Sequence, residues 1–268
     1  MRTCFLLLLG YAAILLLVYC LQEKLIFHPR PITLQKADSI SSLNKNAEAI
    51  SFTMSDGKKV KGWIVRADTL STAPLLIYYG GNAEEISHWV SKSNRFRGWT
   101  LALVNYRGYG LSEGEPSEKV LFSDALEVFD LLKKRGDVFR EKIVVIGRSL
   151  GTGVATYVSS QRPVNATILI TPYESMADLA QEKYPFIPVS PFLKHPFNSI
   201  GMAPLIHTPL LTLIASEDEM IPPPHAEKLA KKWGGRTKVI TIQGEDHGTI
   251  LRSEKCFEEI GKFLFQLQ

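Results

Sequence analysis

The sequence predicts an α/β protein built on a mostly parallel, doubly wound sheet. Short apolar runs alternate with helical stretches along most of the chain. Runs such as 142–146 and 209–214 are apolar on both faces, as expected for strands buried inside a parallel sheet. A chain of 268 residues suits one large domain, because two domains would have small cores. These observations together favour the doubly wound architecture.

The predicted elements follow in chain order. A hairpin comes first, with strands at 49–54 and 60–66 around an Asp56-Gly57 turn. Further strands are expected at 74–79, 99–104, 142–147, 165–170, 208–215 and 237–242. The intervening helices are expected at 83–96, 117–134, 150–161, 223–233 and 250–266.

The N-terminus carries a long apolar segment. No residue between Thr3 and Gln22 is charged, and twenty helical residues would cross about 30 Å of hydrocarbon. We therefore interpret 1–22 as a membrane-anchoring transmembrane helix that gives a single-pass membrane protein. The alternative is a cleaved signal peptide, which the length of the apolar run and the lack of an A-x-A site disfavour. Basic residues flank both ends, so the side of the membrane stays open.

Two segments interrupt the regular pattern. Residues 23–48 are polar and contain Pro29 and Pro31, which predicts a linker between the anchor and a catalytic domain at 49–268. Residues 174–206 contain five prolines among aromatic residues, so no long regular element is expected there. Because this segment lies between two core strands, we expect it to form a cap over the site.

Composition excludes some classes of function. Hydrophobic residues make up 45% and charged residues 22%, which is typical of a globular domain. The net charge is +4, but the densest basic cluster, 133–135, is too short for a nucleic-acid surface, so no nucleic-acid partner is expected. Cys4 and Cys20 belong to the apolar segment, which leaves Cys256 without a partner for a disulfide inside the domain.

The strongest motif is G-x-S-x-G at 147–151, between a predicted buried strand and a predicted helix. A sharp strand-to-helix turn of this kind needs glycines beside the serine and exposes its hydroxyl above the sheet. The motif alone is weak, but the strand before it and the helix after it make it specific. Ser149 is therefore the expected nucleophile.

A serine nucleophile needs a base, and the base needs a carboxylate that orients it. His247 follows the last predicted strand and Asp218 follows the one before it, so both lie where side chains can meet over Ser149. Glu217 and Glu219 are the rival acids. Asp246 is too close in sequence to its histidine to orient it.

The oxyanion of the reaction needs backbone N–H donors. We expect one from Leu150, directly after the nucleophile, and one from Asn82 in the glycine turn that follows the strand ending at Tyr79. Without the serine and the histidine, this turn would be read only as a tight turn.

Other polar residues are given structural roles. Arg107 and Tyr109 are expected to shape their loop, and Glu84 and Glu85 to favour a helix dipole. No phosphate loop, dinucleotide fingerprint or zinc motif is present, so neither a cofactor nor a metal is expected. The remaining histidines lack metal-ligand spacing and are expected at the surface or in packing: His28, His88, His195, His207 and His225.

Four segments together resemble the Bem46-like branch of the α/β hydrolases: 78–83, 105–114, 147–151 and 218–222. The Tyr-Arg-Gly-Tyr-Gly run at 106–110 is more specific than the serine motif. The resemblance covers about residues 50–267 and implies the α/β-hydrolase fold and a small serine hydrolase, often membrane-anchored, with some eukaryotic relatives that remove palmitate from proteins. The family usually has histidine where this chain has Gly80.

Three functions fit these observations. A membrane-anchored hydrolase of carboxylic esters or thioesters, with a lipophilic acyl substrate, comes first because the apolar cap suits an acyl chain. A serine peptidase is second, since no separate domain is present to position a peptide. A non-catalytic membrane-tethered binding module is third. Such a module would not need Ser149, Asp218 and His247 together, and the chain has all three.

Overall fold

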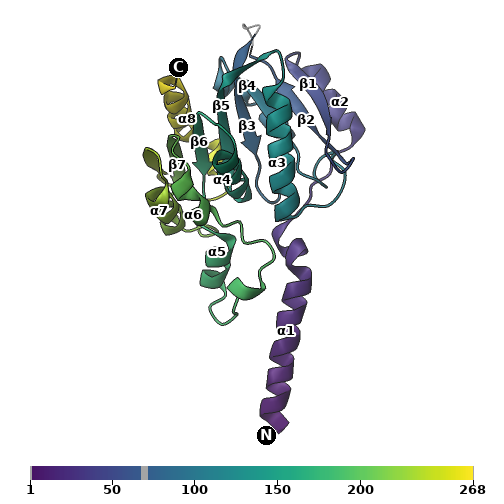
Figure 1. Ribbon diagram of the computed structural model, residues 1–268, viewed down its shortest axis with the longest axis vertical. Coiled ribbons are helices and arrows are strands. Elements are labelled where there is room, and N and C mark those ends of the chain that lie inside the picture. Colours follow the sequence, from purple (N-terminus) through teal and green to yellow (C-terminus); the bar gives the residue numbers. More distant parts are fainter. Residues whose placement is uncertain (1, 68–71, 268) are drawn as a thin grey trace.

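The computed structural model describes residues 2–67 and 72–267. Its centre is an eight-stranded sheet in the order β1-β2-β4-β3-β5-β6-β7-β8, with α-helices on both faces (Figure 1). The strands β1 and β2 pair antiparallel with each other, β2 pairs antiparallel with β4, and all other pairs are parallel. The strands are β1 (Ala47–Thr53), β2 (Lys59–Val65), β3 (Ala73–Tyr79), β4 (Thr100–Val104), β5 (Val138–Arg148), β6 (Ala166–Ile170), β7 (Leu210–Ala215) and β8 (Thr237–Ile242).

The mostly parallel sheet predicted from the sequence is confirmed, and every predicted strand overlaps an observed one. The central strands are buried on both faces. Every residue of β6, for example, is buried. This burial explains why these strands read as continuous apolar runs rather than alternating ones. The largest shift is in β5, which starts at Val138 because that residue pairs with Ala73 before a register shift.

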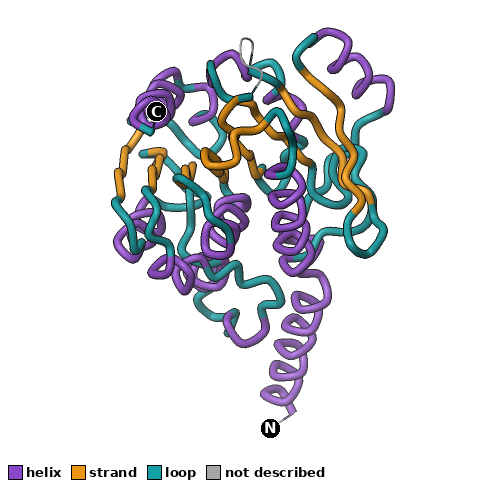
Figure 2. The backbone as a smooth tube through the Cα atoms, turned by 45° about the horizontal axis from the view of Figure 1, so that its top comes forward, coloured by secondary structure: helices purple, strands orange, loops and turns teal. Residues whose placement is uncertain are grey.

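Helices cover the two faces of the sheet unequally (Figure 2). One core lies under α3 (Glu118–Lys133), α4 (Leu150–Gln161) and α7 (Pro223–Lys232). The other lies under α8 (Glu254–Gln266) and three short 3-10 helices, Ile86–Trp89, Ser93–Phe96 and Ile250–Arg252. Alternate residues of β3 supply the two cores, with Ile77 in the first and Tyr78 in the second.

The helix predicted at 83–96 is not continuous. The structure has two 3-10 helices there, Ile86–Trp89 and Ser93–Phe96. An α-helix from residue 83 would need the Asn82 carbonyl to accept the Ile86 N–H. That N–H instead donates to Asn105 Oδ1, and the carbonyl accepts from Tyr109 and His28. Tertiary hydrogen bonds therefore override the local helical pattern.

The segment expected to be a linker contains regular structure and packs on the domain. The apolar helix α1 (Arg2–Ile26) runs past residue 22, and α2 (Leu34–Leu43) follows it. Between them, Phe27 is 3% exposed and belongs to the first core. Pro31 forms a bridge to Gly110, and the Gly110 N–H donates to the Arg30 carbonyl. Residues 27–31 thus join α1 to the domain through fixed contacts.

The cap segment, 174–206, contains more regular structure than its prolines suggest. It holds α5 (Met176–Lys183), α6 (Ser199–Met202) and two 3-10 helices, Ser190–Phe192 and Ala203–Leu205. The helix α5 forms because it ends before Pro185, and Ser175 caps its start by accepting the Asp178 N–H. The cap lies at the same end of the molecule as α1 (Figure 1).

Candidate active site

The turn between β5 and α4 is a strained strand-to-helix junction. Ser149 has φ 51° and ψ −121°, a backbone conformation that non-glycine residues rarely adopt. A Cβ on Gly147 would lie 2.4 Å from the Gly151 carbonyl oxygen, and one on Gly151 would lie 2.1 Å from that of Tyr79. The two glycines therefore let the turn close tightly with the serine at its apex.

Three side chains meet at this turn in a hydrogen-bonded chain. His247 Nε2 lies 2.9 Å from Ser149 Oγ, and His247 Nδ1 lies 2.8 Å from Asp218 Oδ2. All three residues are buried. Asp218 Oδ1 accepts the N–H groups of Met220 and Ile221, which holds the carboxylate in place. With Nδ1–H donating to the carboxylate, Nε2 is free to accept the serine proton.

The rival carboxylates do not contact the histidine ring. Glu217 and Glu219 are exposed on either side of Asp218, in the loop after β7. Asp246 is also exposed, and its Oδ1 accepts the N–H groups of Gly248 and Thr249. Asp246 therefore shapes the turn that carries His247, whereas Asp218 is the carboxylate in contact with it.

The glycine turn after β3 lies directly against the serine. A Cβ on Gly81 would be 3.6 Å from Ser149 Cβ, so nothing larger than hydrogen intervenes. Leu150 is the first residue of α4, where a backbone N–H has no intrahelical partner. The two expected donors, the N–H groups of Asn82 and Leu150, thus belong to backbone segments that border the same serine.

Three hydrogen-bond donors hold the carbonyls of the glycine turn. The Asn82 carbonyl accepts from Tyr109 Oη at 2.5 Å and from the His28 N–H at 3.0 Å. Tyr106 Oη donates to the Gly80 carbonyl at 3.1 Å. A Cβ at residue 80 would lie 3.0 Å from Ile86, so the turn has little room for a histidine at this position. Two tyrosine hydroxyls and the N–H of His28, from the segment expected to be a linker, donate the hydrogen bonds that hold the turn.

Glu84 lies buried beneath the same turn. Its carboxylate accepts the Gly81 N–H at 2.7 Å, Tyr78 Oη at 2.8 Å and Trp89 Nε1 at 2.9 Å. Burial raises the pKa of Glu84, but the His88 hydrogen bond, the Arg148 charge and the Gly81 N–H outweigh it and lower the pKa to about 2. Glu84 is therefore ionised at neutral pH, and its role is to hold the turn rather than to complement a helix dipole.

Arg148 joins the glycine turn to the histidine loop. Its Nη1 lies 3.6 Å from Glu84 Oε2, and its Nη2 donates to the main-chain carbonyl of His247 at 2.8 Å. The sequence motif does not single out Arg148, since any residue can occupy the position before the serine. The role of Arg148 depends on contacts with residues distant in sequence, and the spacing of the motif does not predict such contacts.

The other polar residues considered in the sequence have structural contacts. Arg107 forms ion pairs with Asp124, at 2.7 Å, and with Asp56, and so fixes its loop to α3 and to the hairpin turn. His195 and His225 are buried, and His225 Nδ1 pairs with Glu174. Within residues 2–67 and 72–267, no cluster of His, Cys, Asp or Glu has an arrangement that could hold a metal ion.

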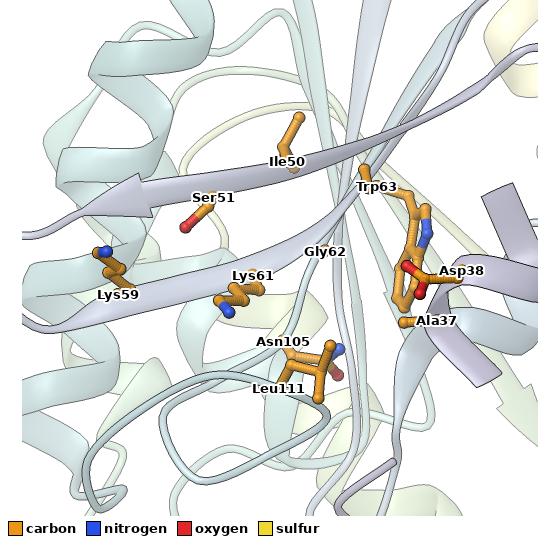
Figure 3. A pocket seen from close by; sticks show the side chains of 11 residues that line it. Ala37, Asp38, Ile50, Ser51, Lys59, Lys61, Gly62, Trp63, Asn105 and Leu111 are labelled. Carbon is orange, nitrogen blue, oxygen red and sulfur yellow. The ribbon is translucent and has the colours of Figure 1, made fainter. Parts of the chain in front are cut away.

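Two pockets bear on where a substrate could bind. One of about 330 Å³ borders the histidine loop, and its ionisable lining residues are Glu84, Glu85, His88, Lys92, Arg148 and Arg252. The other, of about 290 Å³, lies at the β1 edge of the sheet, between α2, the first hairpin and the loop that carries Asn105 and Leu111 (Figure 3). Ser149 lines neither of them, and the second is remote from the chemistry because β1 and β2 form its wall.

Comparisons with known proteins agree with this architecture. The family model for serine hydrolases matches residues 125–258, which include Ser149, Asp218 and His247. The α/β hydrolase domain-containing protein WAV2 of Arabidopsis thaliana is 30% identical over 246 residues, covering 84% of this chain and 80% of its own. An uncharacterized protein of Mycobacterium tuberculosis is 26% identical over 257 residues, covering 94% and 90%.

Solved structures show the same fold. An esterase of Pyrococcus furiosus has a TM-score of 0.68 at 18% identity, covering 90% of this chain and 97% of its own. The 2,6-dihydroxy-pseudo-oxynicotine hydrolase has a TM-score of 0.71 at 18% identity, covering 87% and 70%. At this identity the likeness concerns the fold alone. With the family model and the Arabidopsis relative, the chain belongs to the α/β-hydrolase family of serine hydrolases.

Proposed function

We propose that this serine hydrolase is anchored in a membrane by α1 and cleaves carboxylic ester or thioester bonds, with Ser149 as nucleophile, His247 as general base and Asp218 as the acid that orients the histidine. The observation that carries the proposal is the hydrogen-bonded chain from Asp218 through His247 to Ser149, at 2.8 and 2.9 Å. The geometry suits proton transfer from the serine to the histidine.

The proposed reaction has two halves. In the first, Ser149 Oγ attacks the acyl carbon while His247 Nε2 takes the hydroxyl proton, and the N–H groups of Asn82 and Leu150 stabilise the oxyanion. The tetrahedral intermediate then expels the alcohol or thiol, which receives the proton from His247, and an acyl-serine remains. In the second half, water attacks the acyl-serine and gives its proton to His247. Collapse releases the carboxylic acid and returns the proton to Ser149.

Ester or thioester cleavage is preferred over peptide cleavage. The chain has one catalytic domain and a short cap, and the cap carries exposed apolar side chains that suit an acyl chain better than a peptide. Solved enzymes that share the fold include esterases, which supports the reaction class by analogy only. A purely binding role is disfavoured, because binding alone would not require the strained serine or its buried histidine and aspartate.

Membrane anchoring rests on α1. This helix has 25 residues and is long and apolar enough to cross a bilayer, and its most apolar stretch is not buried against the domain. The same features would suit a cleaved signal sequence. Extraction with alkaline carbonate separates the two, because an anchored chain stays with the membrane and keeps its N-terminal residues.

The enzymatic proposal is tested on the full chain in detergent micelles. A fluorophosphonate probe should label the wild type and the control Ser253→Ala but not Ser149→Ala, because phosphonylation requires the activated hydroxyl. Hydrolysis rates on p-nitrophenyl esters, acyl thioesters and peptides then rank the substrate classes. Equal labelling of Ser149→Ala, or turnover confined to peptides, would contradict the proposal.

A further inference from the structure

A continuous apolar loop lies at the tip of the cap. Residues 184–193 read Tyr-Pro-Phe-Ile-Pro-Val-Ser-Pro-Phe-Leu and contain no charge, while Lys183 and Lys194 flank them. Three of their aromatic side chains are exposed: Tyr184 by 50%, Phe186 by 89% and Phe192 by 51%. Aromatic side chains gathered on one exposed loop are unusual on a soluble surface and indicate an interaction site. We call residues 184–193 the apolar loop.

The apolar loop lies beside the apolar helix α1. Tyr11 Oη donates to the Phe186 carbonyl at 2.9 Å, and Gln22 Nε2 donates to the Phe192 carbonyl at 2.8 Å. Tyr11 and Gln22 are eleven positions apart in the helix, a rise of about 16 Å. The loop therefore runs from the polar end of α1 to the middle of its apolar stretch, on the N-terminal side of the domain (Figure 1).

Charged side chains lie at the end of α1 where the membrane surface is expected. The Lys194 Nζ pairs with Glu23 at 3.2 Å and lies 4.5 Å from the Tyr19 ring centroid. The Lys194 N–H donates to Gln22 Oε1 at 2.8 Å. These polar contacts cluster at the C-terminal end of α1, and everything in the loop beyond them is uncharged. Lysine and tyrosine at such a boundary are typical of the interface between lipid and water.

The backbone of the apolar loop is suited to a medium that offers few hydrogen-bond partners. Three of its residues are prolines, which have no N–H to satisfy. Four of the seven N–H groups that remain are paired: those of Tyr184, Ile187 and Phe192 donate to backbone carbonyls, and that of Val189 donates to the Gln181 side chain. Unpaired backbone groups are what usually exclude irregular chain from lipid.

The position of the loop relative to α1 is held from within the domain. Phe27, directly after α1, is buried, and its ring centroid lies 5.2 Å from that of His195 and 6.3 Å from that of Phe197. Both partners belong to the cap. The junction of helix, cap and domain is therefore packed, and a bilayer that holds α1 would meet the apolar loop at the same face.

From this arrangement we infer that the apolar loop inserts into the bilayer that holds α1, so that the cap and the Ser149 site face the lipid and take acyl esters or thioesters dissolved in it. The inference rests on the proposed membrane anchoring and extends it from a tether to an oriented enzyme. The partner is the phospholipid bilayer itself, because the loop continues the apolar surface of the membrane helix and is followed by Lys194, which contacts Gln22 and Glu23 at the polar end of α1.

The test uses the full chain reconstituted in phosphatidylcholine vesicles. Cys4→Ser and Cys20→Ser remove the exposed thiols, and Cys256 is buried. A nitrobenzoxadiazole label is then placed through Phe186→Cys, through Tyr184→Cys, or through the matched control Phe265→Cys. Phe265 is 74% exposed and lies in α8, at the end of the molecule opposite to α1 (Figure 1).

Insertion predicts a blue-shifted emission for the labels at 184 and 186 and a loss of that emission when doxyl-labelled lipid is included, with neither change at 265. Unquenched emission at both loop positions would overturn the inference. So would a blue shift without doxyl quenching, because it would mean that protein, such as a second copy of the chain, covers the loop.

Carbonate extraction of the same samples scores the anchor separately. A retained chain with unquenched loop labels would leave the anchor standing and refute insertion. Labelling of Ser149 by the fluorophosphonate probe verifies that each variant is folded and scores the catalytic proposal by itself.

Discussion

Arg148 Nη2 donates a hydrogen bond to the main-chain carbonyl of His247 at 2.8 Å, across 99 residues of sequence. The same guanidinium lies 3.6 Å from the buried carboxylate of Glu84, which in turn holds the Gly81 N–H. One side chain beside the serine thus joins the loop of the histidine to the loop of the expected oxyanion donor. We therefore expect the relative position of the two loops to depend on Arg148.

Arg148→Met should lower kcat on a soluble ester by about 10-fold to 100-fold, the range that follows from losing a charge-assisted hydrogen bond. KM should change little, because Arg148 orients the histidine loop and is not proposed to bind substrate. Steady-state kinetics give both constants. Arg95→Met, which breaks an exposed ion pair with Glu254, is the matched control. A normal kcat in the Arg148 variant would show that the loops hold their positions without it.

Asp218→Asn should lower turnover by a factor on the order of 10⁴, because an amide at this position favours the wrong histidine tautomer. The measurement is kcat on a short p-nitrophenyl ester. Glu217→Gln and Glu219→Gln are the matched controls, since both carboxylates are exposed and lie beside Asp218 in the same loop. A mild effect at 218 together with a severe effect at 217 or 219 would reassign the acid.

Glu84 should make the protein acid-sensitive. Its pKa is about 2 in the folded state against an ordinary value of 4.5, so its ionised form favours folding above pH 4.5. That stabilisation, roughly 3 kcal/mol from the pKa difference, is lost as the pH falls from 4.5 towards 2. Urea unfolding at pH 7 and pH 3 measures it.

Glu84→Gln should have a lower free energy of unfolding at pH 7 and a weaker loss between pH 7 and pH 3 than the wild type. Glu115→Gln, at an exposed carboxylate, should follow the wild type at both pH values. An unchanged acid dependence in the Glu84 variant would mean that other carboxylates dominate acid unfolding.

Truncation should separate the anchor from the fold at a defined point. Deletion of residues 1–22 should leave a domain that stays in the supernatant after high-speed centrifugation and keeps near full-length rates on a water-soluble ester. Rates on a membrane-embedded ester should fall, because tethering raises the enzyme concentration near lipid. Aggregation or inactivity of this form would mean that the apolar helix belongs to the fold.

Deletion of residues 1–33 should be destabilising, in contrast to the shorter deletion. It removes the buried Phe27, whose loss costs about 3–5 kcal/mol by analogy with phenylalanine truncations in cores. It also removes the His28 N–H that donates to Asn82 and the pairing of Pro31 with Gly110. Thermal unfolding of the two truncated forms compares them, and equal melting temperatures would show that residues 23–33 contribute no stability.

The sequence alone determined the features that depend on local pattern. Strands buried on both faces read as apolar runs, so the sheet and its strands were predictable. The strand-to-helix turn at Ser149 requires small residues within two positions, so its motif is local as well. The meeting of Asp218 and His247 near Ser149 was predictable because the fold brings the carboxyl ends of parallel strands to one edge, wherever they lie in the chain.

The tertiary structure alone decided the contacts between segments that no spacing connects. The break of the predicted helix at 83–96 and the roles of Glu84 and Arg148 depend on contacts with segments distant in sequence. Burial makes such bonds strong enough to override local propensity, because an unpaired polar group inside the protein costs more than a helical turn gains. The packing of residues 27–31 on the domain, and of the apolar loop beside α1, likewise depends on which surfaces meet in three dimensions.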